Sequence, residues 1–522
     1  MTAWDLGPER GRGGGTESRV PEAVLVSGRV SGAFTVDGVA RFLGVPYARA
    51  PFGSRRFRAP EPVEPWEGVR RATEFGATAP KRPYAPPLDA LLPDPVVEGD
   101  DCLHVNVWAP WGPSGPGTGA GEGGDSGGRP VMVWIHGGSL VHGSNAVPVY
   151  DGTAFARDGV VLVSVNYRLG VEGFGVFPDA PANLGLRDQI AALAWVRENV
   201  AAFGGDPERV TVFGESAGAI SIAALLASPL ARGLFRRAVV QSGAPMALSR
   251  ERARRTTEAV AKRLGVAATA EAFAAVDRER LLTAQTEVTA KGSPLTGGHS
   301  FQLVVDGDVL PRDPAEALGA HGGVPAKGRG FDGAGVDLLM GTTSEEYRLW
   351  FVPSGLVERL SPFLLRLALW KTRVPSRTAR VYRANRPGAR PGELLGALAT
   401  DKLLRVPLNR MADARLRSGA AGRTYLYEFG WPSPVLRLGA CHALELGFVF
   451  DTLHTPEARA MTGPDAPRAL AVAMHAAWVA FAAEGDPGWR AWDKERPVMA
   501  FGPGAPVLVP APRDDERRAW DG

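Results

Sequence analysis

The stretch "RVTVFGESAGAIS", residues 209–221, places a serine between two glycines at the end of an apolar run. The β-branched residues before the serine are typical of a buried strand, and the "AISIAALLAS" that follows is typical of a helix. Gly-x-Ser-x-Gly at a strand-to-helix turn is the pattern of a nucleophile elbow, where a sharp turn exposes the serine oxygen. Glycines are needed because a Cβ at either flank would clash with the neighbouring strand or helix. The pattern predicts that Ser216 is a nucleophile, and the alternative is a hydroxyl in an ordinary tight turn.

Further buried strands are predicted on both sides of this turn. The runs at 131–136, 160–167 and 236–243 are short, β-branched and continuously apolar, as in strands that are covered on both faces of a mostly parallel sheet. Residues 183–205 carry apolar side chains at helical spacing and end at two glycines. Strands that alternate with helices predict an α/β fold with a mostly parallel central sheet flanked by helices.

The 522 residues are expected to form one large domain with insertions. Residues 1–22 are rich in glycine and charge and predict a disordered tail, which is followed by a single domain over residues 23–515. The Gly-rich residues 112–130 predict a flexible surface loop. Ala-, Arg- and Leu-rich sequence at about 250–330 and 354–420 predicts large helical lid insertions over one edge of the sheet.

Composition and charge narrow the classes of partner. The net charge is only +3 and no basic run is long, which argues against nucleic acid. No apolar stretch is long enough to span a bilayer, and the N-terminus lacks the apolar core of a signal peptide. We therefore expect a cytoplasmic protein with no membrane partner, with leaderless export left open. Cys102 and Cys441 are predicted to be free thiols.

A second candidate element is "IHGGSL", residues 135–140, which directly follows a predicted strand upstream of the elbow. Its glycines let the backbone approach closely, so that N–H groups can face a developing oxyanion. The alternative is a Gly-rich turn in which His136 only packs.

The motifs of this chain, in their order, resemble the type-B carboxylesterase and cholinesterase branch of the α/β-hydrolases. The likeness runs from about residue 24 to about residue 510. It rests on the elbow together with "FLGVPYARAPFGSRRFRAP", "DDCLHVNVWAP", "VVLVSVNYRLG", "FRRAVVQSGAP", "GTTSEEY" and "CHALELGFVF". The resemblance implies an α/β-hydrolase that cleaves small-molecule carboxylic esters through an acyl-enzyme intermediate, with a Ser-Glu-His triad.

The resemblance also assigns the triad. Ser216 matches the nucleophile, and aligning "GTTSEEY" on Gly-Thr-Thr puts Glu346 at the acid, with Glu345 facing elsewhere. His442 matches the histidine because it follows the strand-like "RTYLYEF" by a loop. His475 lies in a helix-like segment, where a packing role is expected.

Three backbone N–H groups match the oxyanion hole of this family, those of Gly138, Ser139 and Ala217. Hydroxyl, imidazole, carboxylate and these amides complete the chemistry, so no cofactor and no metal is expected. The sequence contains no His-Glu-x-x-His or Cys-x-x-Cys pattern. Oligomeric state is not predicted.

Departures from the family limit the substrate prediction. No cysteine precedes Cys102, so the disulfide of secreted cholinesterases has no match in this sequence. No tryptophan lies between Trp66 and Trp108, so the cation-π platform that binds the quaternary ammonium in cholinesterases has no match either. Choline esters are therefore not expected as substrates. Arg56 and Asp100 match a structural ion pair of relatives.

A specialised carbamate, lactone or polyester hydrolase is the alternative activity, and a non-catalytic binding member of the fold is the alternative class.

Overall fold

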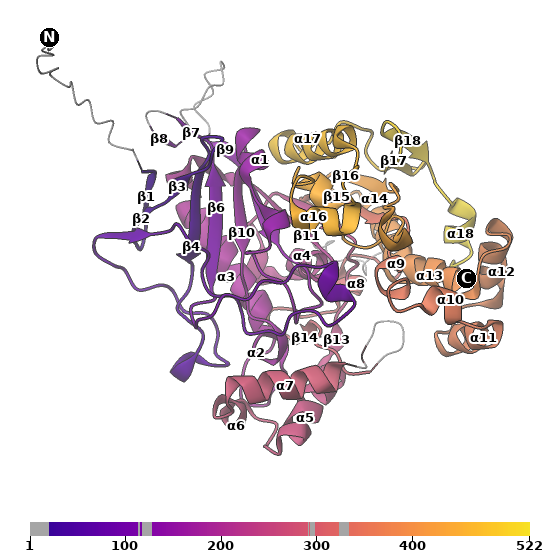
Figure 1. The fold of residues 1–522 in the computed structure, drawn as a ribbon, viewed down its shortest axis with the longest axis horizontal. Coiled ribbons are helices and arrows are strands. Elements are labelled where there is room, and N and C mark those ends of the chain that lie inside the picture. The colour runs from indigo at the N-terminus through magenta and orange to yellow at the C-terminus, as the bar shows by residue number, and fades with distance from the viewer. Residues whose placement is uncertain are drawn as a thin grey trace, which may run out of the picture.

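The computed structural model describes residues 20–112, 115–116, 128–290, 292, 298–322 and 333–521. Within them, eleven strands form a central sheet in the order β18-β17-β16-β15-β12-β11-β9-β10-β6-β4-β3 (Figure 1). All neighbouring pairs from β10 across to β17 are parallel, and the pairs at the two edges are antiparallel. The predicted fold class, a mostly parallel α/β-hydrolase sheet flanked by helices, is confirmed.

The strands of the central sheet are β3 (Ala33–Phe34), β4 (Ala40–Pro46), β6 (His104–Ala109), β9 (Arg129–Ile135), β10 (Val161–Val165), β11 (Gly205–Glu215), β12 (Arg237–Gln241), β15 (Asp337–Thr343), β16 (Thr424–Phe429), β17 (Pro497–Phe501) and β18 (Val507–Pro510). The smaller sheets contain β1 (Glu22–Leu25), β2 (Gly28–Ser31) and β5 (Val69–Arg71), then β7 (Trp111–Gly112) with β8 (Gly115–Pro116), and β13 (Leu248–Ser249) with β14 (Val304–Val305).

The helices are α1 (Thr153–Arg157), α2 (Gly170–Phe174), α3 (Leu184–Asn199), α4 (Ala217–Ala227), α5 (Arg250–Leu264), α6 (Ala270–Ala274), α7 (Arg278–Thr289), α8 (Pro314–Ala317), α9 (Arg348–Phe351), α10 (Leu356–Arg359), α11 (Pro362–Lys371), α12 (Ser376–Asn385), α13 (Pro391–Thr400), α14 (Val406–Ser418), α15 (Leu446–Val449), α16 (Pro456–Thr462), α17 (Arg468–Glu484) and α18 (Asp514–Arg518). Helices α5 to α7 gather at one end of the molecule, and α9 to α13 gather with α18 at another (Figure 1). No helix in the described ranges is long and apolar enough to cross a bilayer.

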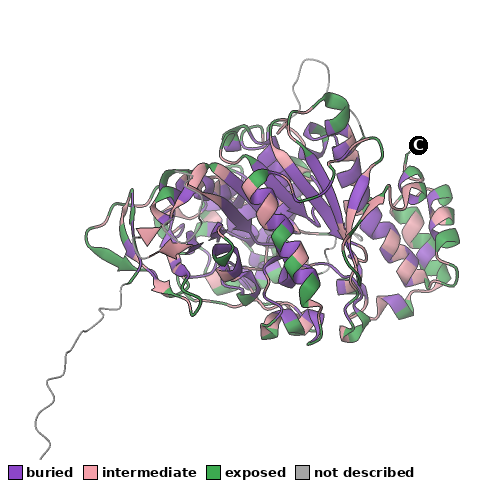
Figure 2. Cartoon of the chain, turned by 90° about the horizontal axis from the view of Figure 1, so that it is seen from above, coloured by how far each residue is buried: buried purple, intermediate pink, exposed green. Residues whose placement is uncertain are grey.

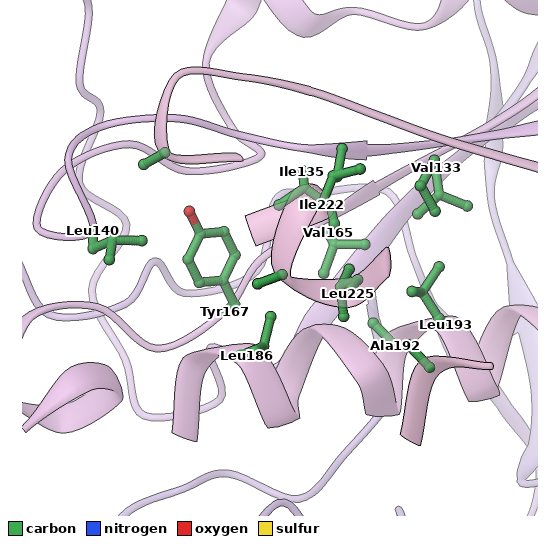
Figure 3. Close-up of a cluster of buried hydrophobic side chains, with 14 of the residues drawn as sticks. Val133, Ile135, Leu140, Val165, Tyr167, Leu186, Ala192, Leu193, Ile222 and Leu225 are labelled. Atoms are coloured by element: carbon green, nitrogen blue, oxygen red, sulfur yellow. The ribbon is translucent and has the colours of Figure 1, made fainter. Parts of the chain in front are cut away.

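Both faces of the sheet are buried, which explains the continuous apolar runs of its strands. On β9, Val131, Val133 and Ile135 belong to one core cluster, which includes residues of α3 and α4 (Figure 3). Met132 and Trp134 belong to a second cluster, which includes residues of α1, α15 and α17. Buried residues accordingly fill the sheet, and exposed residues lie on the outer sides of the helices (Figure 2). The strand predictions are confirmed.

The Arg56–Asp100 ion pair predicted from the sequence is wrong. Arg56 Nη2 lies 2.6 Å from Glu172 Oε1 on α2, and both side chains are nearly buried. Asp100 is 64% exposed and instead pairs with Arg278 at 2.5 Å. A buried guanidinium needs a carboxylate that is buried beside it, and α2 brings Glu172 to that place.

Cys102 and Cys441 are both buried and free, as predicted. The predicted disordered tail falls outside the described residues, except for its last three positions. Most of the predicted loop at 112–130 also falls outside them.

Candidate active site

Ser216 occupies a strained turn between β11 and α4. Its φ is 56° and its ψ is −121°, a conformation that a non-glycine residue adopts only when its surroundings impose it. The backbone N–H of Ser216 donates to the carbonyl oxygen of Gln241 at 2.9 Å, which ties the turn to β12. A Cβ at Gly218 would lie 2.0 Å from the carbonyl oxygen of Ile135. The second glycine of the motif is therefore required by the close approach of α4 to the end of β9.

Glu346 and His442 come from the ends of neighbouring strands. Glu346 lies in the turn after β15 and His442 in the loop after β16. These strands are parallel neighbours, so the two side chains meet at their carboxyl ends. His442 Nδ1 is 2.5 Å from Glu346 Oε2, and both residues are buried. Glu346 Oε1 accepts a hydrogen bond from the N–H of Thr343 at 2.9 Å. The carboxylate is thus held between the N–H of Thr343 and the imidazole of His442.

Glu345 points away from the imidazole, as predicted for adjacent residues after a strand. Its Oε2 accepts from the N–H of Ala440 at 3.1 Å, and its Oε1 lies 3.3 Å from Arg348 Nη1. Of the two neighbouring carboxylates, Glu346 is the one in contact with His442.

A second carboxylate faces the other side of the imidazole. His442 Nε2 is 2.9 Å from Oε1 of Glu215, the residue directly before Ser216. Burial opposes protonation of His442, but Glu215 and Glu346 outweigh it and raise the pKa of the imidazole well above its ordinary value. The ring of Trp350 lies 4.8 Å from the imidazole and covers it.

A third buried carboxyl group, Glu445, lies close to these two. Burial, followed by the charges of Glu215 and Glu346, raises the pKa of Glu445 to about 8. Gln241 Nε2 donates to Glu445 Oε1 at 3.4 Å. Neither Glu215 nor Glu445 was predicted from the sequence, although Glu215 stands inside the elbow motif and Glu445 follows His442 by three residues.

The loop after β9 brings Gly138 and Ser139 to the pocket that Ser216 also lines. Gly138 has a φ of 111°, and a Cβ there would lie 2.2 Å from the carbonyl oxygen of His142, so only glycine fits. Ala217 is the first residue of α4, where a helix leaves its N–H groups without intrahelical acceptors. Of the three residues predicted to form an oxyanion hole, Gly138 and Ser139 thus line the same pocket as Ser216, and Ala217 follows Ser216 directly at the start of α4.

A buried ion pair, Lys81–Asp94, holds this loop. The side chains of Lys81 and Asp94 are 0% and 1% exposed. Lys81 Nζ donates to the carbonyl oxygen of Gly143 and Asp94 Oδ1 accepts from its N–H, each at 3.1 Å. His142 Nδ1 lies 3.4 Å from Asp94 Oδ2. The pair therefore fixes the backbone five residues after Gly138. No sequence motif predicted this pair.

Lys81→Met is expected to lower the free energy of unfolding by about 3–5 kcal/mol, because Asp94 is left as a buried charge without its partner. Urea denaturation measures the loss. Arg254→Gln is the matched control, because it breaks a half-exposed pair with Glu258, and it is expected to cost less than about 1 kcal/mol. A loss from Lys81→Met no larger than that of the control would contradict the buried pair.

The pocket around Ser216 is largely apolar and contains about 870 Å³ of space free of atoms, including its open mouth. The only carboxylates that line it are Glu215 and Glu457, among the described residues. The apolar side chains of its wall include Leu91, Leu92, Pro93, Val147, Val149, Leu349, Trp350, Ala443, Leu444, Leu446, Ala458 and Met461.

His475 takes no part in this pocket. It lies on α17, where its Nδ1 is 2.7 Å from the carbonyl oxygen of Val449 and its ring packs 4.5 Å from that of Phe155. The packing role expected for His475 is confirmed.

Comparisons with known proteins identify the family of the chain. A model of the carboxylesterase family matches residues 20–500. The para-nitrobenzyl esterase of Bacillus subtilis is 38% identical over 491 residues, which cover 90% of this chain and 92% of that protein. The liver carboxylesterase of Sus scrofa is 31% identical, over 94% of this chain and 90% of its own. The crystal structure of a carboxylesterase of Geobacillus stearothermophilus has a TM-score of 0.81 at 36% identity, covering 96% of this chain and 99% of its own. The chain therefore belongs to the carboxylesterase family and is a carboxylic-ester hydrolase.

Proposed function

We propose that the chain hydrolyses small apolar carboxylic esters through an acyl-enzyme on Ser216. Neutral His442 takes the proton of Ser216 Oγ as this oxygen attacks the ester carbonyl. The N–H groups of Gly138, Ser139 and Ala217 donate to the oxyanion that forms. The imidazole returns the proton to the departing alcohol and then activates the water that hydrolyses the acyl-enzyme.

The observation that carries this proposal is the 2.5 Å contact of His442 Nδ1 with Glu346 in a pocket that Ser216 also lines. A carboxylate at Nδ1 keeps the hydrogen on that nitrogen, so Nε2 is left to accept the serine proton. Glu215, at 2.9 Å from Nε2, adds a second negative charge that stabilises the imidazolium formed in each half-reaction.

A panel of substrates tests the proposal. p-Nitrophenyl esters of increasing acyl length are compared with aryl esters, choline esters, carbamates, lactones and a polyester. We expect turnover of p-nitrophenyl and aryl esters and little of choline esters, because most of the pocket wall is apolar. Faster turnover of a carbamate, lactone or polyester would favour the alternative activity, and no turnover by the folded protein would favour a binding role.

Glu215→Gln is expected to move the acid limb of the kcat/KM profile to lower pH. His442 accepts a proton only when neutral, so its raised pKa places this limb above pH 6.5, the ordinary value of an imidazole. Loss of the carboxylate 2.9 Å from Nε2 destabilises the imidazolium and lowers the pKa of His442. Rates between about pH 5 and pH 9 measure the shift. Glu457→Gln, in the same pocket, is the control, and an unmoved or higher limb in Glu215→Gln would contradict this electrostatic role.

Cys441→Ser is expected to keep most of the turnover. Cys441 adjoins His442, but burial, followed by the charges of Glu346 and Glu445, raises the pKa of its thiol well above the ordinary value. The thiol is therefore not ionised at neutral pH. Measurement of kcat/KM on one short-chain ester tests this, and loss of activity in Cys441→Ser while Ser216→Ala stays active would make the thiol the nucleophile.

A further inference from the structure

Helix α11 carries an uncovered apolar face. Phe363, Leu364, Leu367 and Trp370 are 71%, 46%, 48% and 78% exposed. Their spacing of i, i+1, i+4 and i+7 puts them on one side of the helix, while Leu365 is buried against the protein. A patch of four large apolar side chains on one short helix is unusual for a surface that faces only water.

The same segment is strongly cationic. Residues 356–390 contain nine Lys or Arg and one Glu, whereas the whole chain has 59 Lys or Arg and 56 Asp or Glu. The rest of the chain is therefore acidic on balance, and the positive charge is concentrated here. Arg366 and Lys371 are exposed on α11, Arg373 is exposed just after it, and Arg380 and Arg383 are exposed on α12.

We propose that α11 is a docking surface for an anionic lipid bilayer. Its apolar face lies at the boundary between headgroups and acyl chains, where tryptophan and phenylalanine are favoured. The arginine and lysine side chains around it bind lipid phosphates, which they match in charge and in hydrogen-bonding geometry. Helix α11 lies at the outer edge of the molecule, away from the central sheet (Figure 1), where a flat surface can reach it.

A second copy of the chain fits this face less well. If two copies met at this segment, their positive charges would face each other, and like charges across an interface are strongly unfavourable. One ten-residue helix also offers far less area than a stable dimer buries. The expectation of no membrane partner rested on the lack of a spanning segment, and a helix that lies flat on a bilayer needs none.

Flotation of the full chain with vesicles tests the proposal. Vesicles of phosphatidylcholine alone are compared with vesicles that contain about one third phosphatidylglycerol, at low and high salt. We expect binding to the anionic vesicles, loss of most of this binding in high salt, and little binding to phosphatidylcholine alone. No binding to anionic vesicles by the unmodified chain would overturn the proposal.

Two variants separate the apolar and the charged contributions. The double change Phe363→Ser and Trp370→Ser, and the double change Arg366→Gln and Lys371→Gln, are each expected to weaken the partition coefficient by about tenfold or more. The controls carry matched changes elsewhere. Val472→Ser alters a valine of α17 that is 57% exposed, and Arg252→Gln with Lys262→Gln removes two charges from exposed positions of α5. The controls are expected to bind as the unmodified chain does.

Turnover of a soluble p-nitrophenyl ester is expected to stay unchanged in all of these variants, which shows that they are folded. Vesicle binding is measured independently of catalysis, so its outcome does not depend on whether the proposed triad is correct. Binding by the α11 variants equal to that of the unmodified chain would overturn the proposal. The proposal would also be overturned if vesicles were not bound and sedimentation showed instead a dimer, or a complex with an acidic protein, that depends on Phe363 and Trp370.

Discussion

Ser216→Ala is expected to reduce kcat by a factor on the order of 10⁶, because the acyl-enzyme can no longer form. The fold is expected to persist, since alanine retains the Cβ of serine and the turn is held by the backbone hydrogen bond to Gln241. Steady-state kinetics on a short-chain ester, with circular dichroism and urea denaturation alongside, measures both effects.

Covalent labelling gives a second view of the same prediction. An organophosphate is expected to add a single group to the unmodified chain, on Ser216, and none to Ser216→Ala. Ser228→Ala, at the end of α4, removes another buried hydroxyl and serves as the control that keeps its turnover and its label. A label mapped by mass spectrometry to another residue, or turnover near normal in Ser216→Ala, would show that the nucleophile lies elsewhere.

Glu346→Gln is expected to reduce turnover by up to about 10⁴, because the amide no longer favours the imidazole tautomer with its hydrogen on Nδ1. It also removes one of the two negative charges that stabilise the imidazolium. The loss is expected in kcat, with the secondary structure unchanged by circular dichroism.

Glu345→Gln is the matched control for this change, one residue away. Glu345 contacts the N–H of Ala440 and the guanidinium of Arg348, so its loss affects the turn rather than the imidazole. We expect it to keep most of the turnover. If Glu345→Gln lost more activity than Glu346→Gln, the assignment of the acid would be off by one residue.

The parts of the structure that follow from local pattern were predictable from the sequence. Strands buried on both faces are recognisable as continuous apolar runs. The elbow is recognisable because close packing around its serine leaves no room for a Cβ at Gly214 or Gly218. The placement of His442 after a strand, and of His475 within a helix, follows from the same patterns, and the contacts of His475 agree.

Contacts between distant segments were not predictable in this way. Arg56 pairs with Glu172 rather than with Asp100 because Glu172 is buried beside it, whereas Asp100 is exposed. The Lys81–Asp94 pair belongs to no motif, because its role depends on where the loop after β9 comes to lie. For α11, the sequence indicates an apolar face but not whether the rest of the chain covers it.

The pocket draws its wall from five stretches of chain, at 84–93, 137–150, 215–216, 349–350 and 442–462. Its first and last pieces are separated by most of the polypeptide, and they meet only when long chain loops have closed, which is a slow event in folding. The recovery of ester turnover after dilution from denaturant thus measures the rate at which the last long chain loops close. Far-ultraviolet circular dichroism reports the earlier gain of helix and sheet. A lag between the two signals would time the assembly of the pocket.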